Sequence, residues 1–163
     1  ISRALAGAGY GILRFDFTGL GDSQGDFADT NFSSNCGDLL SAVQFLSENF
    51  AAPSLIIGHS FGGAAALAVG QSIDSILGVA TIASPSDTHH LAALLERMNP
   101  AIAERGIGEV TIGGRQYTIK RAMLDDFRRL LAQGTDEEQR AAVAALRESP
   151  DPEAARLLAS APA

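Results

Sequence analysis

The hexapeptide Gly-His-Ser-Phe-Gly-Gly at residues 58–63 constrains the fold of this chain more than any other feature. It fits the pattern Gly-x-Ser-x-Gly with Ser60 at the centre. An apolar run, residues 54–58, leads directly into it, and a run of small residues, 61–72, follows it directly. This order is typical of a nucleophile elbow, a tight strand-to-helix turn that holds a reactive serine in a strained backbone conformation. The alternative interpretation is a glycine turn with an incidental serine.

The elbow interpretation assigns a role to each residue around Ser60. The Ser60 hydroxyl would attack a carbonyl group, and the backbone N–H of Phe61 would donate to the oxyanion that forms. The N-terminus of the following helix would place the positive end of its dipole at the same point. We also expect that a side chain at Gly58 or Gly62 would collide with the neighbouring turn.

The first half of the chain alternates predicted strands with predicted helices. Short apolar runs at 11–17, 54–58 and 77–83 are typical of strands, and helical patterns lie between them. Strands that alternate with helices favour a parallel sheet flanked by helices, so the predicted fold class is α/β.

A helix is predicted after a Gly-rich loop at residues 18–25. Ser33 or Ser34 would cap its N-terminus, because a hydroxyl can accept from the free N–H groups there. Apolar residues at spacings of three and four predict one buried face on this helix, made of Leu39, Leu40, Val43, Leu46 and Phe50.

The second half of the chain has a different pattern. Residues 91–105 are typical of a helix with a break, and residues 109–119 predict a hairpin around a Gly-Gly turn. Residues 120–133 predict an amphipathic helix, whose solvated face would carry Asp125 and Asp126.

These patterns divide the chain into three expected parts. Residues 1–87 would form a partial core that contains the elbow. Residues 88–134 would form an inserted cap, here called the lid, built from helices and the hairpin. Residues 135–163 would form a helical tail of unclear origin. Because the sequence starts at Ile1 within a helical pattern and without a Met, we expect it to be a piece of a longer gene product.

Composition excludes several classes of function. Nineteen Asp and Glu against twelve Lys and Arg give a net charge of −7, which disfavours nucleic-acid binding and a polybasic membrane-surface role. The single cysteine, Cys36, excludes an internal disulfide and a cysteine-based zinc cluster, and we expect neither a metal nor a cofactor. No apolar run reaches the roughly 18 residues of a membrane helix, and no signal-peptide pattern is present, so we expect a cytoplasmic location.

The elbow and the segment Arg14–Phe27 (RFDFTGLGDSQGDF) together resemble the α/β-hydrolase superfamily. Three further segments, 27–35, 80–87 and 112–127, are similar to a subgroup that carries a hydrolase-like domain followed by an OsmC-like domain. The resemblance covers residues 1–128. It implies a partial α/β-hydrolase fold, a small-molecule acyl substrate, and an OsmC-like domain as a partner in the parent chain.

The resemblance also implies a catalytic acid and a histidine on strands that follow the lid, and no such strand is predicted here. Asp87 and His89 follow the third predicted strand and could serve as acid and base. Alternatively, Ser86 or Asp87 caps the next helix, and His89 and His90 lie on its surface. His59 lies inside the elbow, and its side chain should point to the face opposite Ser60.

A missing strand is a further consequence of the resemblance. The family places a strand between those predicted here at 11–17 and 54–58, and this chain lacks it. The two predicted strands would have to pair directly or leave a gap about one strand spacing (~4.8 Å) wide. Such a gap leaves backbone N–H and C=O groups without partners, which is costly.

The predicted function is hydrolysis of an ester, thioester or amide by a complete parent protein, with this chain inactive on its own. The second hypothesis is a truncated, non-catalytic or partner-binding α/β domain. A base within hydrogen-bond reach of Ser60 would distinguish the two. A third hypothesis is a flavodoxin-like domain that binds phosphate or flavin at Thr18–Gly25.

Overall fold

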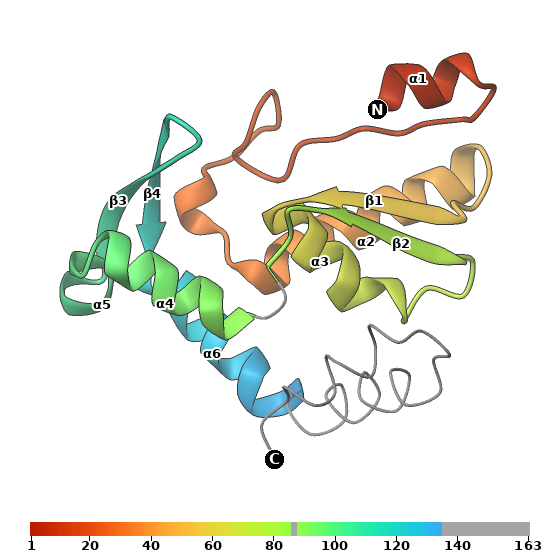
Figure 1. The fold of residues 1–163 in the computed structure, drawn as a ribbon. Helices are drawn as coiled ribbons and strands as arrows, with labels where there is room; N and C mark the ends of the chain where they lie inside the picture. The colour runs from red at the N-terminus through yellow and green to blue at the C-terminus, as the bar shows by residue number, and fades with distance from the viewer. Residues whose placement is uncertain (86–87, 135–163) are drawn as a thin grey trace, which may run out of the picture.

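The structure, a computed structural model, describes residues 1–85 and 88–134, except the side chains of residues 88–90 and 130–134. Its elements form two parts, a sheet with its helices and a hairpin with its helices (Figure 1). The sheet part consists of α1 (Ser2–Gly7), the 3-10 helix η1 (Phe27–Asp29), α2 (Phe32–Asn49), β1 (Leu55–His59), α3 (Phe61–Gly70) and β2 (Gly78–Ile82). The hairpin part consists of α4 (Thr88–Met98), α5 (Ala101–Arg105), β3 (Ile107–Ile112), β4 (Arg115–Lys120) and α6 (Arg121–Gly134).

β1 and β2 form a two-stranded parallel sheet, paired from Leu55 opposite Gly78 to His59 opposite Ile82. α3 connects the two strands and packs against both of them. Its buried face consists mainly of glycine and alanine, so the helix backbone can approach the sheet closely. The parallel sheet flanked by helices confirms the predicted α/β fold class.

Residues 11–17, predicted as a strand, form none. Figure 1 shows this segment as an elongated trace beside β1, and within the described residues no backbone hydrogen bond joins the two. The side chains of Ile12, Leu13 and Phe15 remain 38–43% exposed. The prediction is wrong because a strand needs a neighbour for its backbone N–H and C=O groups, and a local apolar pattern does not reveal whether one is present.

The N-cap of α2 is Asn31, so the prediction of Ser33 or Ser34 is wrong. The Asn31 side chain accepts from the Ser34 N–H at 2.8 Å, and the Ser34 hydroxyl accepts from the Asn31 N–H at 3.0 Å. This is a reciprocal capping box. The predicted buried face of α2 is only partly buried, since Leu39 is 7% exposed but Phe50 is 75% exposed. Periodicity indicates which residues share a face, but not how far the covering elements extend.

The predicted hairpin is confirmed. β3 and β4 pair antiparallel, and the turn residues Gly113 and Gly114 have φ of 59° and 79°, which the tightest hairpin turns require. α6 confirms the predicted amphipathic helix, and its buried face contains Met123, Leu124 and Phe127. These residues belong to the same buried cluster as residues of β1 and α3, so the two parts share one hydrophobic core.

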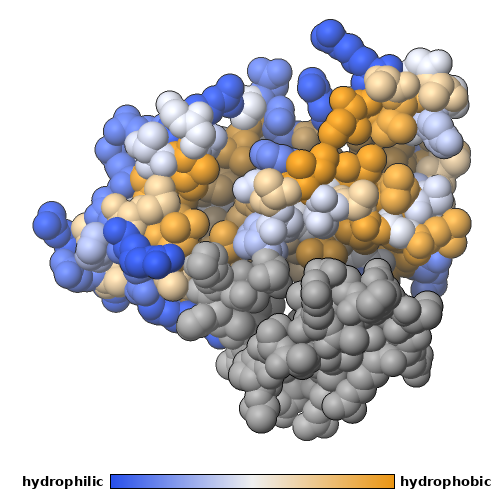
Figure 2. Space-filling view, in the orientation of Figure 1, coloured by the Kyte–Doolittle hydropathy of each residue, from blue (hydrophilic) through white to orange (hydrophobic). Residues whose placement is uncertain are grey.

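The surface is strongly apolar over the sheet part. Figure 2 shows hydrophobic residues gathered there and a recess between the two parts. Leu55, Ile57 and Ile82, all on the strands, are 40–52% exposed. Among residues 1–85 and 88–134, no helix combines the length and the apolarity that crossing a bilayer requires. The helix predicted within residues 135–163 lies outside the described residues.

Candidate active site

The strand, turn and helix predicted around Ser60 are all present. β1 ends at His59 and α3 begins at Phe61, so Ser60 alone makes the turn. Its backbone has φ 51° and ψ −122°, a conformation that residues with a side chain rarely adopt. The Ser60 N–H donates to the Ile82 carbonyl at 2.9 Å and thereby extends the pairing of β1 with β2. One other non-glycine residue among those described has a positive φ, Ala83 at the end of β2.

Glycines keep this turn tight. A Cβ on Gly58 would lie 2.5 Å from the Gly63 Cα, so the predicted collision at this position is confirmed. The same prediction for Gly62 is wrong, because a Cβ there would meet only the Phe17 ring, at an ordinary 3.6 Å. Gly63 is the second constrained position, since its Cβ would come within 2.7 Å of the Ser84 side chain. The helix is therefore pressed against the ends of both strands.

The first turn of α3 offers backbone donors beside Ser60. The N–H groups of Gly63 and Ala64 donate to the Ser60 carbonyl, at 2.9 and 3.2 Å. For the N–H groups of Phe61 and Gly62, the described part of the chain provides no backbone acceptor. Because a helix N-terminus also carries partial positive charge, these N–H groups suit an anion that forms at the Ser60 side chain. The oxyanion role of Phe61 stays a prediction.

The ring of Phe61 is the centre of an aromatic cluster. Its centroid lies 5.5 Å from that of Phe32, 6.1 Å from Phe127, 6.2 Å from Phe17 and 6.4 Å from Phe27. All four contacts are edge-to-face, the arrangement that aromatic rings favour. The rings come from segments far apart in the sequence, and Phe127 comes from α6 of the hairpin part. The residue directly after Ser60 is thus held by both parts of the molecule.

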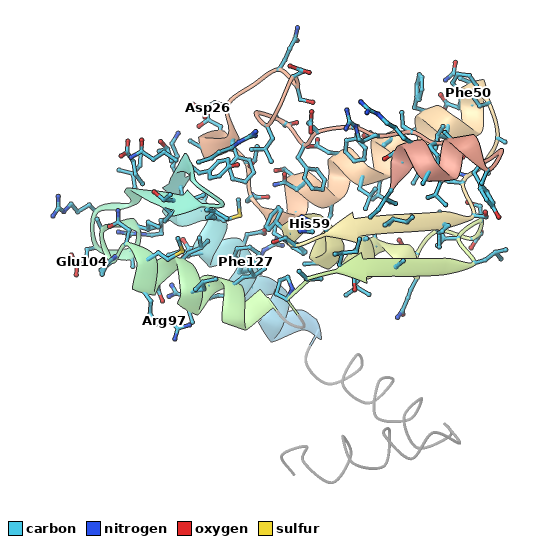
Figure 3. All side chains as sticks on the ribbon, turned by 45° about the horizontal axis from the view of Figure 1, so that its top comes forward. Asp26, Phe50, His59, Arg97, Glu104 and Phe127 are labelled. Carbon is cyan, nitrogen blue, oxygen red and sulfur yellow. The ribbon has the colours of Figure 1, made fainter. Side chains whose placement is uncertain are left out.

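The structure describes the other predicted site residues only in part. His59 lies exposed at the end of β1 (Figure 3). Asp87 lies outside the described residues, and so do the side chains of His89 and His90. α4 begins at Thr88, shortly after β2 ends, which places the backbone of His89 in the first turn of that helix. The roles of Asp87 as acid and His89 as base therefore stay predictions.

The prediction of a solvated position is wrong for Asp126, which is buried, and confirmed for Asp125, which is exposed. Asp126 is 5% exposed, and its carboxylate accepts from the Ser33 N–H at 2.6 Å and from the Ser33 hydroxyl at 2.9 Å. Arg129 also donates to it, at 2.5 Å. Burial would raise the pKa of Asp126, but these hydrogen bonds outweigh burial and hold the pKa below its usual value. Asp126 thereby joins α6 to the first turn of α2, a contact without any local sequence signal.

The Gly-rich loop at 18–25 is built around carboxylates. The Thr18 N–H and hydroxyl donate to Asp38, at 2.8 and 3.1 Å. A Cβ on Gly21 would collide with the carboxylate of Asp16, which lies against the loop. Negative groups at these positions repel a phosphate. The loop therefore does not favour the flavodoxin-like hypothesis.

Cys36 is unsuited to nucleophilic chemistry. Burial, and then the charge of Asp126, raises the pKa of Cys36 to about 11, so its thiol stays protonated near neutral pH. Among the residues that the structure describes, no three His, Cys, Asp or Glu side chains are grouped to hold a metal ion. Of the reactive side chains in the described region, Ser60 is the one held in a strained turn beside free backbone donors.

Comparison with known proteins identifies similar hydrolases. Residues 2–163 match the profile of the Alpha/beta hydrolase family. The mitochondrial palmitoyl-protein thioesterase ABHD10 of Mus musculus is 30% identical over 92 residues, 54% of this chain and 30% of that protein. The Homo sapiens protein of the same name is 32% identical over 79 residues, 46% of this chain and 25% of its own length. This chain thus spans less than a third of the curated relatives that it matches.

Two solved structures are similar. The esterase domain of a Rhodothermus marinus protein has a TM-score of 0.54 and 37% identity, over 79% of this chain and 48% of that domain. A protein of Agrobacterium vitis S4, named for a presumed hydrolase activity, has a TM-score of 0.63 and 26% identity. That match covers 78% of this chain and 52% of the other. Both relatives share the fold, and this chain corresponds to about half of each.

Proposed function

This chain belongs to the Alpha/beta hydrolase family, and on that premise we propose that Ser60 is the nucleophile of an acyl hydrolase acting on an ester, thioester or amide. The observation that carries the proposal is the strained Ser60 turn beside the Phe61 N–H, for which the described residues provide no backbone acceptor. The esterase and thioesterase names of the relatives support a hydrolase activity.

In the proposed reaction, the Ser60 Oγ attacks the substrate carbonyl while a histidine takes its proton. The negative charge that develops on the carbonyl oxygen is stabilised by the Phe61 N–H and the dipole of α3. The bond to the leaving group then breaks, the leaving group takes the proton, and the acyl group stays on Ser60 as an ester. Water hydrolyses that ester by the same steps and releases the acid.

The histidine has two candidate sources. His89 lies in the first turn of α4, which starts shortly after β2 on the same edge of the sheet as Ser60, with Asp87 as its acid partner. Alternatively, the histidine comes from residues that are not among these 163. The second source is in line with the matched structures, of which this chain spans about half. In that case the chain alone is inactive, since loss of triad members removes most of the rate enhancement.

The remaining expectations extend the same proposal. Residues 88–134 act as the lid over Ser60, because Phe127 of α6 contacts Phe61 of the elbow and Tyr117 of the hairpin contacts Phe27 of η1. The OsmC-like domain in the parent chain and the cytoplasmic location remain predictions from the sequence.

A non-catalytic, partner-binding role is the second candidate, and one observation favours it. Leu55, Ile57 and Ile82 on the two strands are 40–52% exposed, and β1 has no partner on its outer edge within the described residues. Apolar strands with a free edge suit association with another polypeptide.

Labelling with a fluorophosphonate separates the two candidates. The wild type, Ser60→Ala and the control Ser47→Ala are compared after near-UV circular dichroism shows that each is folded. Ser47 is a suitable control because its hydroxyl lies exposed on α2 and donates to its own helix, at the Val43 carbonyl. The hydrolase proposal expects labelling of the wild type and Ser47→Ala only. A folded wild type that does not react contradicts an active site within this chain and favours the non-catalytic role.

A further inference from the structure

The aromatic residues around Ser60 divide into two groups by exposure. Phe32 and Phe127 are 2% and 0% exposed, so their role is to fill the core. Phe17, Phe27, Phe61 and Tyr117 are only half-buried, although they pack against that core. Packing explains the first group fully, whereas the second group leaves part of its ring surface open to solvent.

Three of the half-buried rings form a continuous series that starts at Phe61 of the elbow. The Phe61 ring contacts the Phe27 ring at 6.4 Å between centroids, and Phe27 contacts Tyr117 at 5.8 Å. These residues come from α3, η1 and β4, so the series runs from the residue after Ser60 across to the hairpin. We call Phe61, Phe27 and Tyr117 the aromatic strip.

The aromatic strip is fixed at its far end by polar contacts. Lys120 of β4 forms an ion pair with Asp29 of η1, next to the Phe27–Tyr117 contact. Within η1, the Ala28 N–H donates to the Asp26 carboxylate at 2.9 Å, and the Thr30 hydroxyl donates to the Phe27 carbonyl at 2.8 Å. A preformed surface loses little conformational entropy when a ligand binds.

We propose that the aromatic strip binds an apolar alkyl group of the substrate, the acyl chain that becomes attached to Ser60. This inference rests on the proposed function. When the Ser60 Oγ–acyl bond forms and the bond to the leaving group breaks, the acyl chain must lie along a surface that begins at Ser60. The strip begins at Phe61, the residue next to Ser60, and its three rings carry no charge, so they suit a hydrocarbon chain rather than a polar acyl group.

A second exposed aromatic pair provides a matched control. Phe45 and Phe50 lie at the far end of α2, 5.9 Å apart between centroids, and both are largely exposed. Figure 3 shows Phe50 at the opposite end of the sheet part from His59, and therefore away from the elbow. The two sites have similar ring contacts but differ in their distance from Ser60.

Binding of dodecanoate, below its micelle concentration, tests the strip without requiring activity. Isothermal titration calorimetry compares the wild type with Phe27→Ala, Tyr117→Ala, the conservative Tyr117→Phe, and the control Phe50→Ala. We expect about tenfold weaker binding for Phe27→Ala and for Tyr117→Ala, and wild-type binding for the other two variants. Circular dichroism identifies a variant that has not folded, and Tyr117 then provides the test independently of Phe27. Binding that is unchanged in both alanine variants, or weakened as much by Phe50→Ala, overturns the proposal.

A second measurement separates this inference from the proposed function. Methyl and dodecyl fluorophosphonates are compared for their rate of reaction with Ser60. Faster reaction of the dodecyl reagent, with the preference lost in Tyr117→Ala, supports both statements. Dodecanoate binding without any labelling supports the strip and contradicts catalysis within this chain. Equal labelling by both reagents, without dodecanoate binding, supports the nucleophile and overturns the strip.

Discussion

The sheet part and the hairpin part differ in strand pairing and in the burial of their apolar side chains. In the hairpin part, β3 and β4 are paired along their whole length, and Val110, Ile119 and Leu124 are 0–3% exposed. In the sheet part, β1 is paired on one edge among the residues that the structure describes, and alternate residues of that strand, such as Leu55 and Ile57, are exposed. The candidate nucleophile nevertheless lies in the sheet part. Two antiparallel strands joined by a short turn pair directly with each other. A strand of a parallel sheet pairs with a segment much further along the chain.

The two parts meet at the aromatic cluster and at Asp126. Phe127 of α6 contacts both Phe32 and Phe61, and Asp126 of the same helix binds Ser33 of α2. The hairpin part therefore supports the sheet part at the N-termini of α2 and α3. If this view is right, changes at the junction should be more damaging than changes on the open face of the sheet.

Phe127→Ala tests the junction with the largest expected effect. The side chain is fully buried between the two parts, so its loss should lower the free energy of unfolding by about 4 kcal/mol. Urea denaturation followed by circular dichroism measures the change. The matched substitution Ile57→Ala lies on the open face of the sheet and should cost less than about 1 kcal/mol. Equal losses in the two variants would remove the contrast between the parts.

Gly58→Ala tests the elbow itself. The new methyl group would lie 2.5 Å from the Gly63 Cα, a backbone atom, so the helix must shift. We expect a loss of about 3 kcal/mol in the same assay, because overpacking against backbone is not relieved by rotamer changes.

Gly37→Ala is the control for this substitution. Gly37 lies inside α2 with no atom of another element near its Cβ position, so alanine there should stabilise the chain by about 0.5–1 kcal/mol. A Gly58→Ala variant as stable as the wild type would show that the turn is not tightly packed.

Asp126→Asn tests the polar contact between the parts and has the smallest expected effect. Neutralising a buried carboxylate that accepts three hydrogen bonds should cost about 2 kcal/mol at neutral pH. Since the pKa of Asp126 is lowered in the folded state, its stabilising effect is present above the unfolded pKa, about 4. That effect is lost as the pH falls through the folded pKa.

The measurement is the free energy of unfolding of both proteins as a function of pH. The difference between the wild type and Asp126→Asn should be constant above about pH 5 and shrink in acid. Asp125→Asn, at an exposed position on the same helix, should change stability by less than about 0.5 kcal/mol. A pH-independent difference for Asp126→Asn would mean that shape, not charge, holds the contact.

Much of the fold follows from local patterns. The hairpin could be predicted because Gly113 and Gly114 allow the positive φ that its turn needs. The elbow turn could be predicted in outline because Gly58, Ser60 and the small residues of α3 are adjacent in sequence. The strand at 11–17 and the role of Gly62 were predicted incorrectly, since both depend on neighbours that are distant in the chain.

The candidate site shows the same division. Ser60 and the Phe61 N–H could be proposed from six consecutive residues, because the strained turn is a local property of the backbone. The aromatic strip could not, because Phe27, Phe61 and Tyr117 belong to three separate segments. Nothing in the spacing of these residues indicates that their rings meet.

Local sequence patterns suffice for the Gly-Gly hairpin and for the strand, turn and helix around Ser60, because these depend on interactions between residues close along the chain. Three features emerge only in three dimensions: β1 has one partner strand among the described residues, Asp126 is buried against Ser33, and the rings of Phe61, Phe27 and Tyr117 meet in series. Hydrogen bonding between strands, burial of a charge and ring packing all require groups from distant segments to come together. A one-dimensional pattern records which groups are available, but not which of them meet.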